Sequence, residues 1–321
     1  MAKNFLFHIG FHKTGTSWLQ NEFFEKSSFF NTFSNQKKWQ SELAWPFIMD
    51  KENYLLNSND LNSKEILKSF VQFSEVLNNK INVVSHERLS GNPHNGGFDS
   101  LAISRRIKNI FPNAKILIVI REQKCFLLSN YYQYLSVGGT VSLKKYLNAK
   151  YDGKYSYFSP NHIKYHFIIK NYYETFGKKN VLVIPYEMFK VDSKLFLHTI
   201  AKFVNVKANL NNVDTSKKIN NKSNFYVNYK LRSLNIFLTS NSINDYYPLN
   251  IKLFKVITKS IKTIFGTFVP SEFDTKLRKK QMEYIKEWSK NRYEESNILT
   301  KELINSNSND FDLNKYFKSY D

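Results

Sequence analysis

Residues 4–20 read NFLFHIGFHKTGTSWLQ, and this one stretch sets the architecture that we expect for the whole chain. Its first residues, Asn4 to Ile9, are mostly apolar or aromatic with little polar alternation, which is typical of a buried parallel strand. Gly10 and Gly15 then bracket a short loop, and helix-like sequence begins at Ser17. This order predicts an anion-binding turn, because a helix N-terminus presents free N–H groups and a positive dipole end.

Three more segments share the character of the first strand, namely Ile81 to Ser85, Lys115 to Ile120 and Asn180 to Ile184. Each leads into helix-like sequence, so the chain predicts βαβ units and a parallel sheet. The expected helices run from Ser17 to Lys26, Asn161 to Phe176, Ser193 to Phe203 and Ser271 to about Ile304, with a break in the last one left open. The fold class is therefore α/β, a central parallel sheet flanked by helices, with ligands at the carboxyl ends of the strands.

The composition limits the classes of protein that the chain can belong to. With 321 residues and 42% hydrophobic residues, it can bury a large core, which argues against global disorder. The net charge of +20 favours anionic partners without saying which. Cys125 is the only cysteine, which excludes a disulfide framework and a cysteine-rich metal site. No signal peptide and no membrane-spanning run are evident, so we expect a cytoplasmic protein.

The loop after the first strand resembles a nucleotide-triphosphate P-loop in its glycine spacing but not in its lysine. Gly10 and Gly15 have the spacing of the pattern G-x-x-x-x-G-K-[ST], yet Thr16 stands where that pattern has lysine. The lysine comes earlier, at Lys13, and would meet a phosphate from a different side. No strand end offers a convincing acid for holding Mg²⁺. The loop is therefore interpreted as an anion cradle other than a Mg²⁺–ATP site.

A second basic residue follows another expected strand. Arg121 comes directly after the apolar run that ends at Ile120, and Ser129 lies eight residues later, about two helical turns on. A guanidinium at a strand end can grip a phosphate through two N–H bonds, and Ser129 can return toward the same ligand. Taken alone, Arg121 could equally be half of a surface ion pair.

Together the two loops resemble those of sulfotransferases that use 3′-phosphoadenosine 5′-phosphosulfate (PAPS), and they look more like the bacterial members of that family. The first loop matches the family pattern Pro-Lys-[Ser/Thr]-Gly-[Thr/Ser]-[Thr/Ser], except that His12 replaces the proline of cytosolic members. The likeness covers most of residues 1–206 and thins beyond them. It implies a P-loop-like nucleotide-binding fold. The glycine-containing C-terminal segment that closes over the donor in cytosolic members is not found here.

The resemblance also implies which residues bind the donor. Those of the first loop would hold the 5′-phosphosulfate: His12, Lys13, Thr14, Gly15, Thr16 and Ser17. Arg121 and Ser129 would read the 3′-phosphate. Trp18 would stack on the adenine, and packing in the core is an equally good interpretation of this residue.

Catalysis needs a cation at the leaving oxygen and a base for the acceptor hydroxyl. Lys13 is the expected cation. For the base, the segment after the second strand offers His86 and Glu87, and relatives use either a glutamate or a histidine in this region. We favour Glu87 over His86, because neighbouring side chains of an extended segment alternate and one of the two should face the cleft.

We therefore expect one sulfotransferase domain over residues 1–321, with a donor-binding core to about residue 206 and a mainly helical part over 207–321. It would transfer a sulfuryl group from PAPS to a hydroxyl, on a carbohydrate or glycolipid, and release 3′-phosphoadenosine 5′-phosphate (PAP) without a metal. The alternatives are a P-loop kinase that uses ATP and a non-enzymatic binder of nucleic acid or another anionic surface. The paired donor loops count against both, so no nucleic-acid partner is expected.

The segment 249–265 predicts a basic amphipathic helix. Its lysines fall on one side at about 100° per residue and its large apolar residues fall on the other. One interpretation is peripheral contact with an anionic membrane surface. The interpretation that we favour is an ordinary helix packed on the core with solvated lysines.

Overall fold

The structure is a computed structural model of the 321-residue chain. It describes residues 4–32, 44, 47–48, 80–149, 158–207, 213–215, 225–237, 260, 264–266, 268–307, 311–317 and 320. The segment 249–265, expected to be an amphipathic helix, therefore lies outside the described residues except for 260, 264 and 265.

Within the described residues, the centre of the fold is a parallel sheet of five strands in the order β2-β3-β1-β4-β5. The strands are β1 (Phe5–Gly10), β2 (Phe30–Asn31), β3 (Ile81–Ser85), β4 (Lys115–Ile120) and β5 (Val181–Pro185). β1, β3 and β5 are buried along their whole length, which is why they read as continuous apolar runs. This confirms the predicted α/β class and four of the strands. β2 was missed because two residues carry no periodic signal.

Helices connect and cover these strands. The longer helices are α4 (Ser100–Ile110), α5 (Gln123–Ser136), α7 (Tyr165–Phe176), α9 (Ser193–Phe203), α12 (Ser271–Ser289) and α13 (Glu294–Asn305). The shorter α-helices are α1 (Thr16–Trp18), α6 (Leu143–Leu147), α8 (Tyr186–Val191), α10 (Phe225–Lys230) and α14 (Asn314–Phe317). A π-helical segment, η1 (Leu19–Phe24), continues α1, and the 3-10 segments are η2 (Glu87–Ser90), η3 (Pro93–Asn95), η4 (Pro160–Ile163), η5 (Lys178–Asn180) and η6 (Arg232–Phe237).

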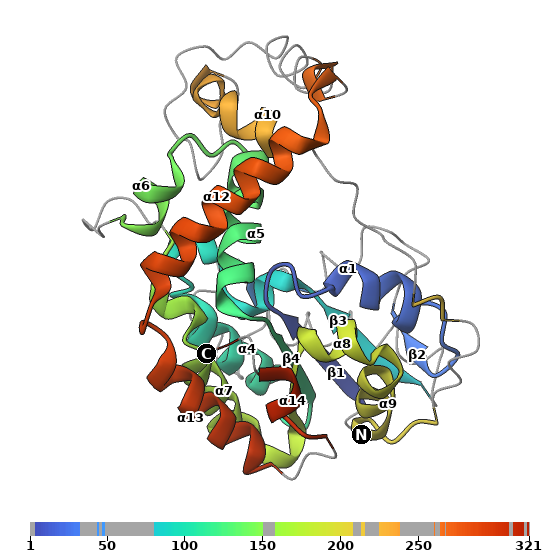
Figure 1. The fold of residues 1–321 in the computed structure, drawn as a ribbon. Helices are drawn as coiled ribbons and strands as arrows, with labels where there is room; N and C mark the ends of the chain where they lie inside the picture. Colours follow the sequence, from blue (N-terminus) through green and yellow to red (C-terminus); the bar gives the residue numbers. More distant parts are fainter. Residues whose placement is uncertain are drawn as a thin grey trace.

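The helices form layers on the two sides of the sheet. α4, α7 and α13 lie together on one side, and α1, α8 and α9 lie on the other (Figure 1). The strand order places β3 on one side of β1 and β4 on the other, and such a reversal of direction along a parallel sheet puts the connecting helices on opposite faces. Because all five strands are parallel, their carboxyl ends lie at the same edge of the sheet, where the loops after β1, β3 and β4 meet.

The expected helix from Ser271 to about Ile304 is divided into two, a break that the sequence analysis left open. α12 ends at Ser289, and Asn291 adopts a positive φ of 58°, a conformation that ends a helix and that asparagine tolerates. α12 packs along α5 and carries α10 beside it, and α13 turns back to pack on α7 (Figure 1). No helix among the described residues is long and apolar enough to cross a membrane.

Candidate active site

The loop after β1 is curled by two positive φ angles. Lys13 has φ of 65° and Gly15 has φ of 84°, one on each side of Thr14. The Thr14 hydroxyl donates a hydrogen bond of 2.6 Å to the carbonyl of Phe11 and so closes the loop on itself. A side chain in the left-handed region is uncommon outside glycine, asparagine and aspartate. The loop therefore holds Lys13 in a strained conformation that leaves its side chain exposed.

Both glycines of the loop are required by close neighbours. A Cβ on Gly10 would collide with Oγ1 of Thr16, and one on Gly15 would lie 2.9 Å from the ring of Tyr186. Oγ1 of Thr16 is buried and has no hydrogen-bond partner. A buried hydroxyl without a partner is costly, so a polar group bound in the loop would relieve it.

Arg121 joins the two loops that the sequence singled out. Its Nη1 donates to the carbonyl oxygen of Lys13 at 2.7 Å and to Oγ of Ser129 at 3.3 Å. Arg121 and Ser129 therefore meet as the eight-residue spacing predicts. Nε of Arg121 is buried without a partner, and the guanidinium lies 5.4 Å from the centre of the Tyr186 ring. The pair thus carries an unused donor beside the loop that holds Lys13.

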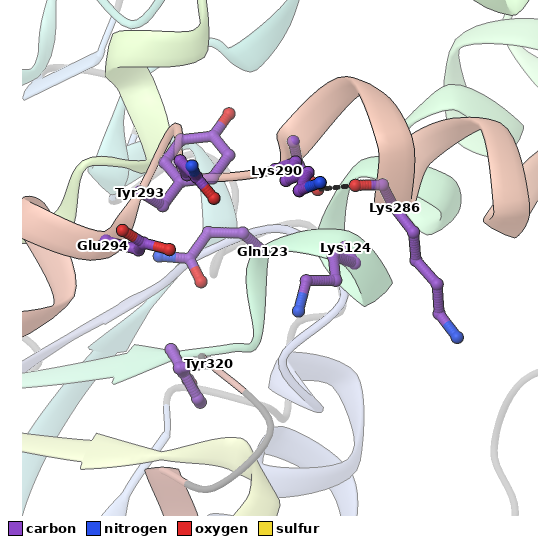
Figure 2. Close-up of a pocket in the computed structure, with 9 residues that line it drawn as sticks. Gln123, Lys124, Lys286, Lys290, Tyr293, Glu294 and Tyr320 are labelled. Carbon is purple, nitrogen blue, oxygen red and sulfur yellow. Dashed lines mark hydrogen bonds between the residues drawn. The ribbon is translucent and has the colours of Figure 1, made fainter.

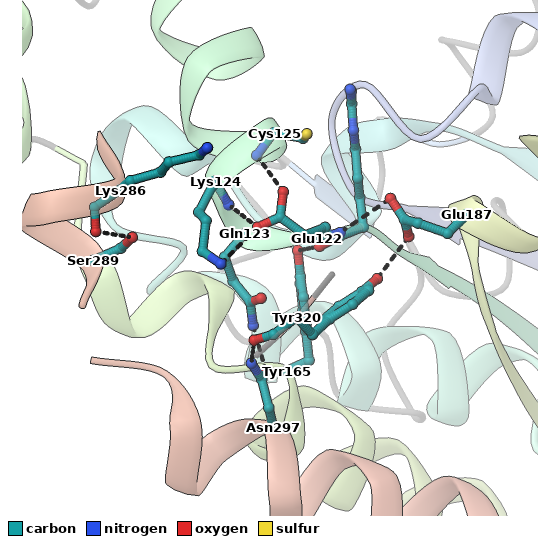
Figure 3. A network of polar contacts seen from close by, with 11 residues as sticks. Glu122, Gln123, Lys124, Cys125, Tyr165, Glu187, Lys286, Ser289, Asn297 and Tyr320 are labelled. Carbon is teal, nitrogen blue, oxygen red and sulfur yellow. Dashed lines mark hydrogen bonds and ion pairs between the residues drawn. The ribbon is translucent and has the colours of Figure 1, made fainter. Parts of the chain in front are cut away.

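A buried polar network holds the backbone on either side of this arginine (Figure 3). The Tyr165 hydroxyl donates to the carbonyl of Arg121 at 2.5 Å, and the backbone N–H of Glu122 donates to Oε1 of Glu187 at 3.4 Å. Glu122 itself caps α5 by accepting from the N–H groups at positions 124 and 125. The hydroxyl of Tyr320 donates to Oε2 of Glu187 at 2.9 Å. A residue near the C-terminus thereby supports the strand end that carries Arg121.

The sequence did not identify Tyr165 or Tyr320 as parts of this arrangement. Tyr165 and Tyr320 are fully buried, and burial, before any other cause, raises the pKa of both hydroxyls well above the usual value. They therefore stay protonated and act as hydrogen-bond donors. Single tyrosines in helical or loop sequence carry no signal that would distinguish them from core aromatics.

Glu87 and His86 follow β3 and have different surroundings. The ring of His86 accepts a hydrogen bond of 3.0 Å from the N–H of Arg88 through Nδ1, so it caps the 3-10 helix η2. Burial, and then the charge of Arg88, lowers the pKa of His86 to about 4. The Glu87 carboxylate is about one-third exposed, and its Oε1 faces Nε2 of His12 at 3.5 Å. The Glu87 carboxylate therefore faces the loop after β1, whereas the His86 ring caps η2.

The remaining predicted donor residues occupy mixed positions. The His12 ring is buried and faces Glu87, and the Ser17 side chain is exposed. The Trp18 ring is only 7% exposed and packs against Phe189, with ring centroids 4.6 Å apart. That is the place expected of a core aromatic. A contact between Trp18 and the adenine stays a prediction.

A surface pocket of about 250 Å³ lies beside the start of α5, where α12 and α13 meet (Figure 2). Its lining comes from three places in the chain: Gln123, Lys124, Lys286, Ser289, Lys290, Asn291, Tyr293, Glu294 and Tyr320. At about 100° per residue, Ser129 lies on another face of α5 from Gln123 and Lys124. The pocket is therefore separate from the pair formed by Arg121 and Ser129. Among the described residues, no group of three or more His, Cys, Asp or Glu is arranged to hold a metal ion.

Comparison with known proteins gives one family match and several similar solved structures. A family model described as the sulfotransferase domain matches residues 4–249. A solved sulfotransferase from Alicyclobacillus acidocaldarius is similar at 15% identity and a TM-score of 0.48, over 79% of this chain and 100% of that one. A sulfotransferase domain of the Synechococcus PCC 7002 olefin synthase is similar at 12% and 0.39, over 84% and 97%. A mouse sulfotransferase complexed with PAP is similar at 16% and 0.32, over 72% and 65%. The search of curated proteins found no match.

Proposed function

Since the chain belongs to the sulfotransferase domain family, we propose that it transfers a sulfuryl group from PAPS to a hydroxyl of an acceptor molecule. The observation that carries this proposal is Arg121, which bridges the carbonyl of Lys13 and the hydroxyl of Ser129. One guanidinium thereby couples the loop suited to a 5′-phosphosulfate with a second position suited to a 3′-phosphate. A nucleotide with anionic groups at its 5′ and 3′ positions would contact both the loop and the pair formed by Arg121 and Ser129.

The residues present fit such a donor. The unpartnered hydroxyl of Thr16 and the N–H groups at the start of α1 would receive the 5′ group, and Gly10 leaves room for the Thr16 hydroxyl. Nε of Arg121 and the Ser129 hydroxyl would receive the 3′-phosphate. When bound, PAPS supplies an activated sulfuryl group on a phosphate leaving group.

Lys13 is the proposed catalytic cation. Its backbone is tied to Arg121 and its ammonium group is exposed at the mouth of the loop. Negative charge grows on the leaving phosphate oxygen as the bond to sulfur breaks, so a positioned ammonium stabilises the transition state more than the ground state. We assign this role to Lys13.

Glu87 is the proposed base. Nδ1 of His86 is already used as the capping acceptor for the N–H of Arg88, and burial keeps that ring neutral. The carboxylate of Glu87 is partly open to solvent and belongs to the 3-10 helix next to β1. General-base help from a positioned carboxylate is typically worth about 10²–10⁴-fold in rate.

A carbohydrate or glycolipid hydroxyl is the acceptor class that we propose, on the resemblance of the chain to bacterial and glycan-modifying members. The single-domain organisation over residues 1–321 belongs to the same proposal. The family match favours sulfuryl transfer over the two alternatives, an ATP-dependent kinase and a non-enzymatic binder of anionic surfaces.

Thermal-shift measurements with PAP, ADP and ATP test the donor assignment, because stabilisation grows as RT ln(1 + [L]/Kd). We expect PAP to stabilise the fold more than ADP does at equal concentration, without added metal, since ADP lacks the 3′-phosphate. Transfer of ³⁵S from labelled PAPS to a panel of glycans and glycolipids then identifies the acceptor. Equal shifts for PAP and ADP, or a shift that needs Mg²⁺ and ATP, would contradict the proposal.

A further inference from the structure

Two polar side chains, one of which donates a hydrogen bond, approach a single oxygen of Glu87. Nε2 of His12 lies 3.5 Å from Oε1, and the side-chain amide of Gln133 donates to the same oxygen at 3.3 Å. His12 belongs to the loop after β1 and Gln133 belongs to α5, so the carboxylate of η2 is approached from two other elements. No contact to Oε2 of Glu87 is recorded among the described residues. One oxygen is therefore held and the other is available.

The protonation of His12 follows from its surroundings. Its side chain is only 3% exposed, and Nδ1 is buried without a partner, whereas Nε2 has the Glu87 carboxylate in front of it. The tautomer with hydrogen on Nε2 is therefore the one that turns an N–H group toward the carboxylate. The Nε2–H group of that tautomer faces Glu87, and the other ring nitrogen faces the interior.

The groups around the ring keep it neutral. Burial lowers the pKa of His12 well below its usual value, and the nearby rings of His94, His162 and His86 and the guanidinium of Arg88 lower it further. These groups belong to η2 and its cap residue, to η3 and to η4, and together with burial they lower the pKa of His12 although the Glu87 carboxylate is close. The contact with Glu87 is that of a neutral N–H donor and a carboxylate.

We propose that His12 is a positioning residue for the base: its Nε2–H, together with Gln133, holds Oε1 of Glu87 and leaves Oε2 to take the proton of the acceptor hydroxyl. This rests on the proposed function. As the acceptor oxygen bonds to sulfur, the bond from sulfur to the phosphate oxygen breaks, and the hydroxyl proton passes to Oε2. His12 gains and loses no proton in this step.

The loop after β1 then has two tasks, divided between neighbouring residues. The Lys13 side chain is exposed, where the proposed nucleotide would meet it, and the His12 ring is buried against the proposed base. Because both belong to one short loop, the geometry that places the cation also places the base. A displacement of this loop would therefore misplace both the cation and the base.

A pair of substitutions at position 12 separates positioning from packing. Glutamine can place its amide N–H where Nε2 of histidine stood, whereas the shorter asparagine reaches only the position of Nδ1. We expect His12→Asn to lower kcat about 10- to 100-fold and His12→Gln to stay within about threefold. The affinity for PAP and the KM for PAPS should change less than about twofold in both, because neither substitution touches Arg121. The acid limb of the kcat–pH profile should move to higher pH in His12→Asn only.

A double-mutant cycle tests whether His12 acts through Glu87. In a Glu87→Gln background, His12→Asn should lower kcat no further, because the residue that it positions is already lost. An additional tenfold loss there would overturn the proposal, as would equal losses in His12→Asn and His12→Gln. His162→Gln is the packing control, since His162 is a buried neighbour with no contact to Glu87, and its kcat should match the wild type.

A measurement without turnover keeps this inference distinct from the proposed function. In protein labelled with ¹⁵N-histidine, NMR should find His12 neutral, with its proton on Nε2, from about pH 8 down to about pH 5, and Glu87→Gln should shift that resonance. A proton on Nδ1, or titration near neutral pH, would overturn the inference. If the NMR result holds but no acceptor is sulfated from PAPS, the proposed function fails while the contact between His12 and Glu87 stands.

Discussion

Replacing His8 by asparagine should make the protein less sensitive to acid. His8 lies in the middle of β1 with no exposed surface, and its Nδ1 hydrogen-bonds Oγ of Ser85 at 2.8 Å. Burial lowers the pKa of His8 to about 3. The folded state therefore excludes a proton that the unfolded state binds below about pH 6.5. Stability from this residue is fully present above that pH and is lost as the pH falls toward about 3.

The size of the effect follows from linkage. Lowering the pH from about 7 to about 5.5 favours the unfolded state by about 1 kcal/mol for one such histidine, whatever its folded-state pKa, provided that it lies below about 4.5. Burial also lowers the pKa of His86 and His94 to about 4 and that of His162 to about 3, so these three and His8 together contribute about 4 kcal/mol. That is a large share of the 5–15 kcal/mol by which folded proteins are typically stable.

Urea unfolding of wild type and His8→Asn at both pH values measures this contribution. Asparagine can keep a hydrogen bond to Ser85 in place of Nδ1, so its packing cost should be the same at both pH values and cancel in the comparison. The general repulsion within a chain of net charge +20 cancels in the same way. We expect the wild type to lose about 1 kcal/mol more than the variant. A difference below about 0.3 kcal/mol would refute the reasoning.

Three further predictions concern the candidate site. Arg121→Ala should weaken binding of PAP and PAPS about 10- to 100-fold, as measured by calorimetry. It should weaken binding of adenosine 5′-phosphosulfate much less, because that ligand lacks the 3′-phosphate. Lys13→Ala should lower kcat far more than it lowers PAP affinity, since its charge acts on the leaving oxygen; a large affinity loss with kcat intact would make Lys13 a ground-state anchor. Tyr320→Phe should lower the free energy of unfolding by about 1–3 kcal/mol in urea titrations, because Oε2 of the buried Glu187 loses its donor; no change would mean that another donor replaces it.

The elements that could be predicted are those whose cause is local. A strand buried on both faces of a parallel sheet must be apolar at successive positions, so β3 and β4 were predicted at the bounds that the structure has. The two glycines of the first loop predicted a tight turn, and the structure packs Thr16 against Gly10 and Tyr186 against Gly15. The family was likewise predicted from two short loops, and the match over residues 4–249 confirms it. The individual site roles stay predictions.

The contacts that make the site depend on residues far apart in the chain. Arg121 meets the carbonyl of Lys13 across 108 positions, and Tyr320 reaches Glu187 across 133. No local pattern specifies such pairs, because which strands become neighbours is settled only when the whole sheet forms. β1 lies between β3 and β4, and that order brings their three following loops to one edge.

The division between His12 and Lys13 shows the same limit within one loop. The sequence by itself determined that an anion-binding loop with a lysine follows the first strand, and it suggested that the neighbouring histidine serves the same anion. Only the tertiary structure decided that the Lys13 side chain is exposed while the His12 ring is buried against Glu87. The direction of a loop side chain depends on the backbone conformation and on the room that neighbouring elements leave. Here the positive φ of Lys13 and the packing of η2 beside β1 set both, and neither can be deduced from a run of residues alone.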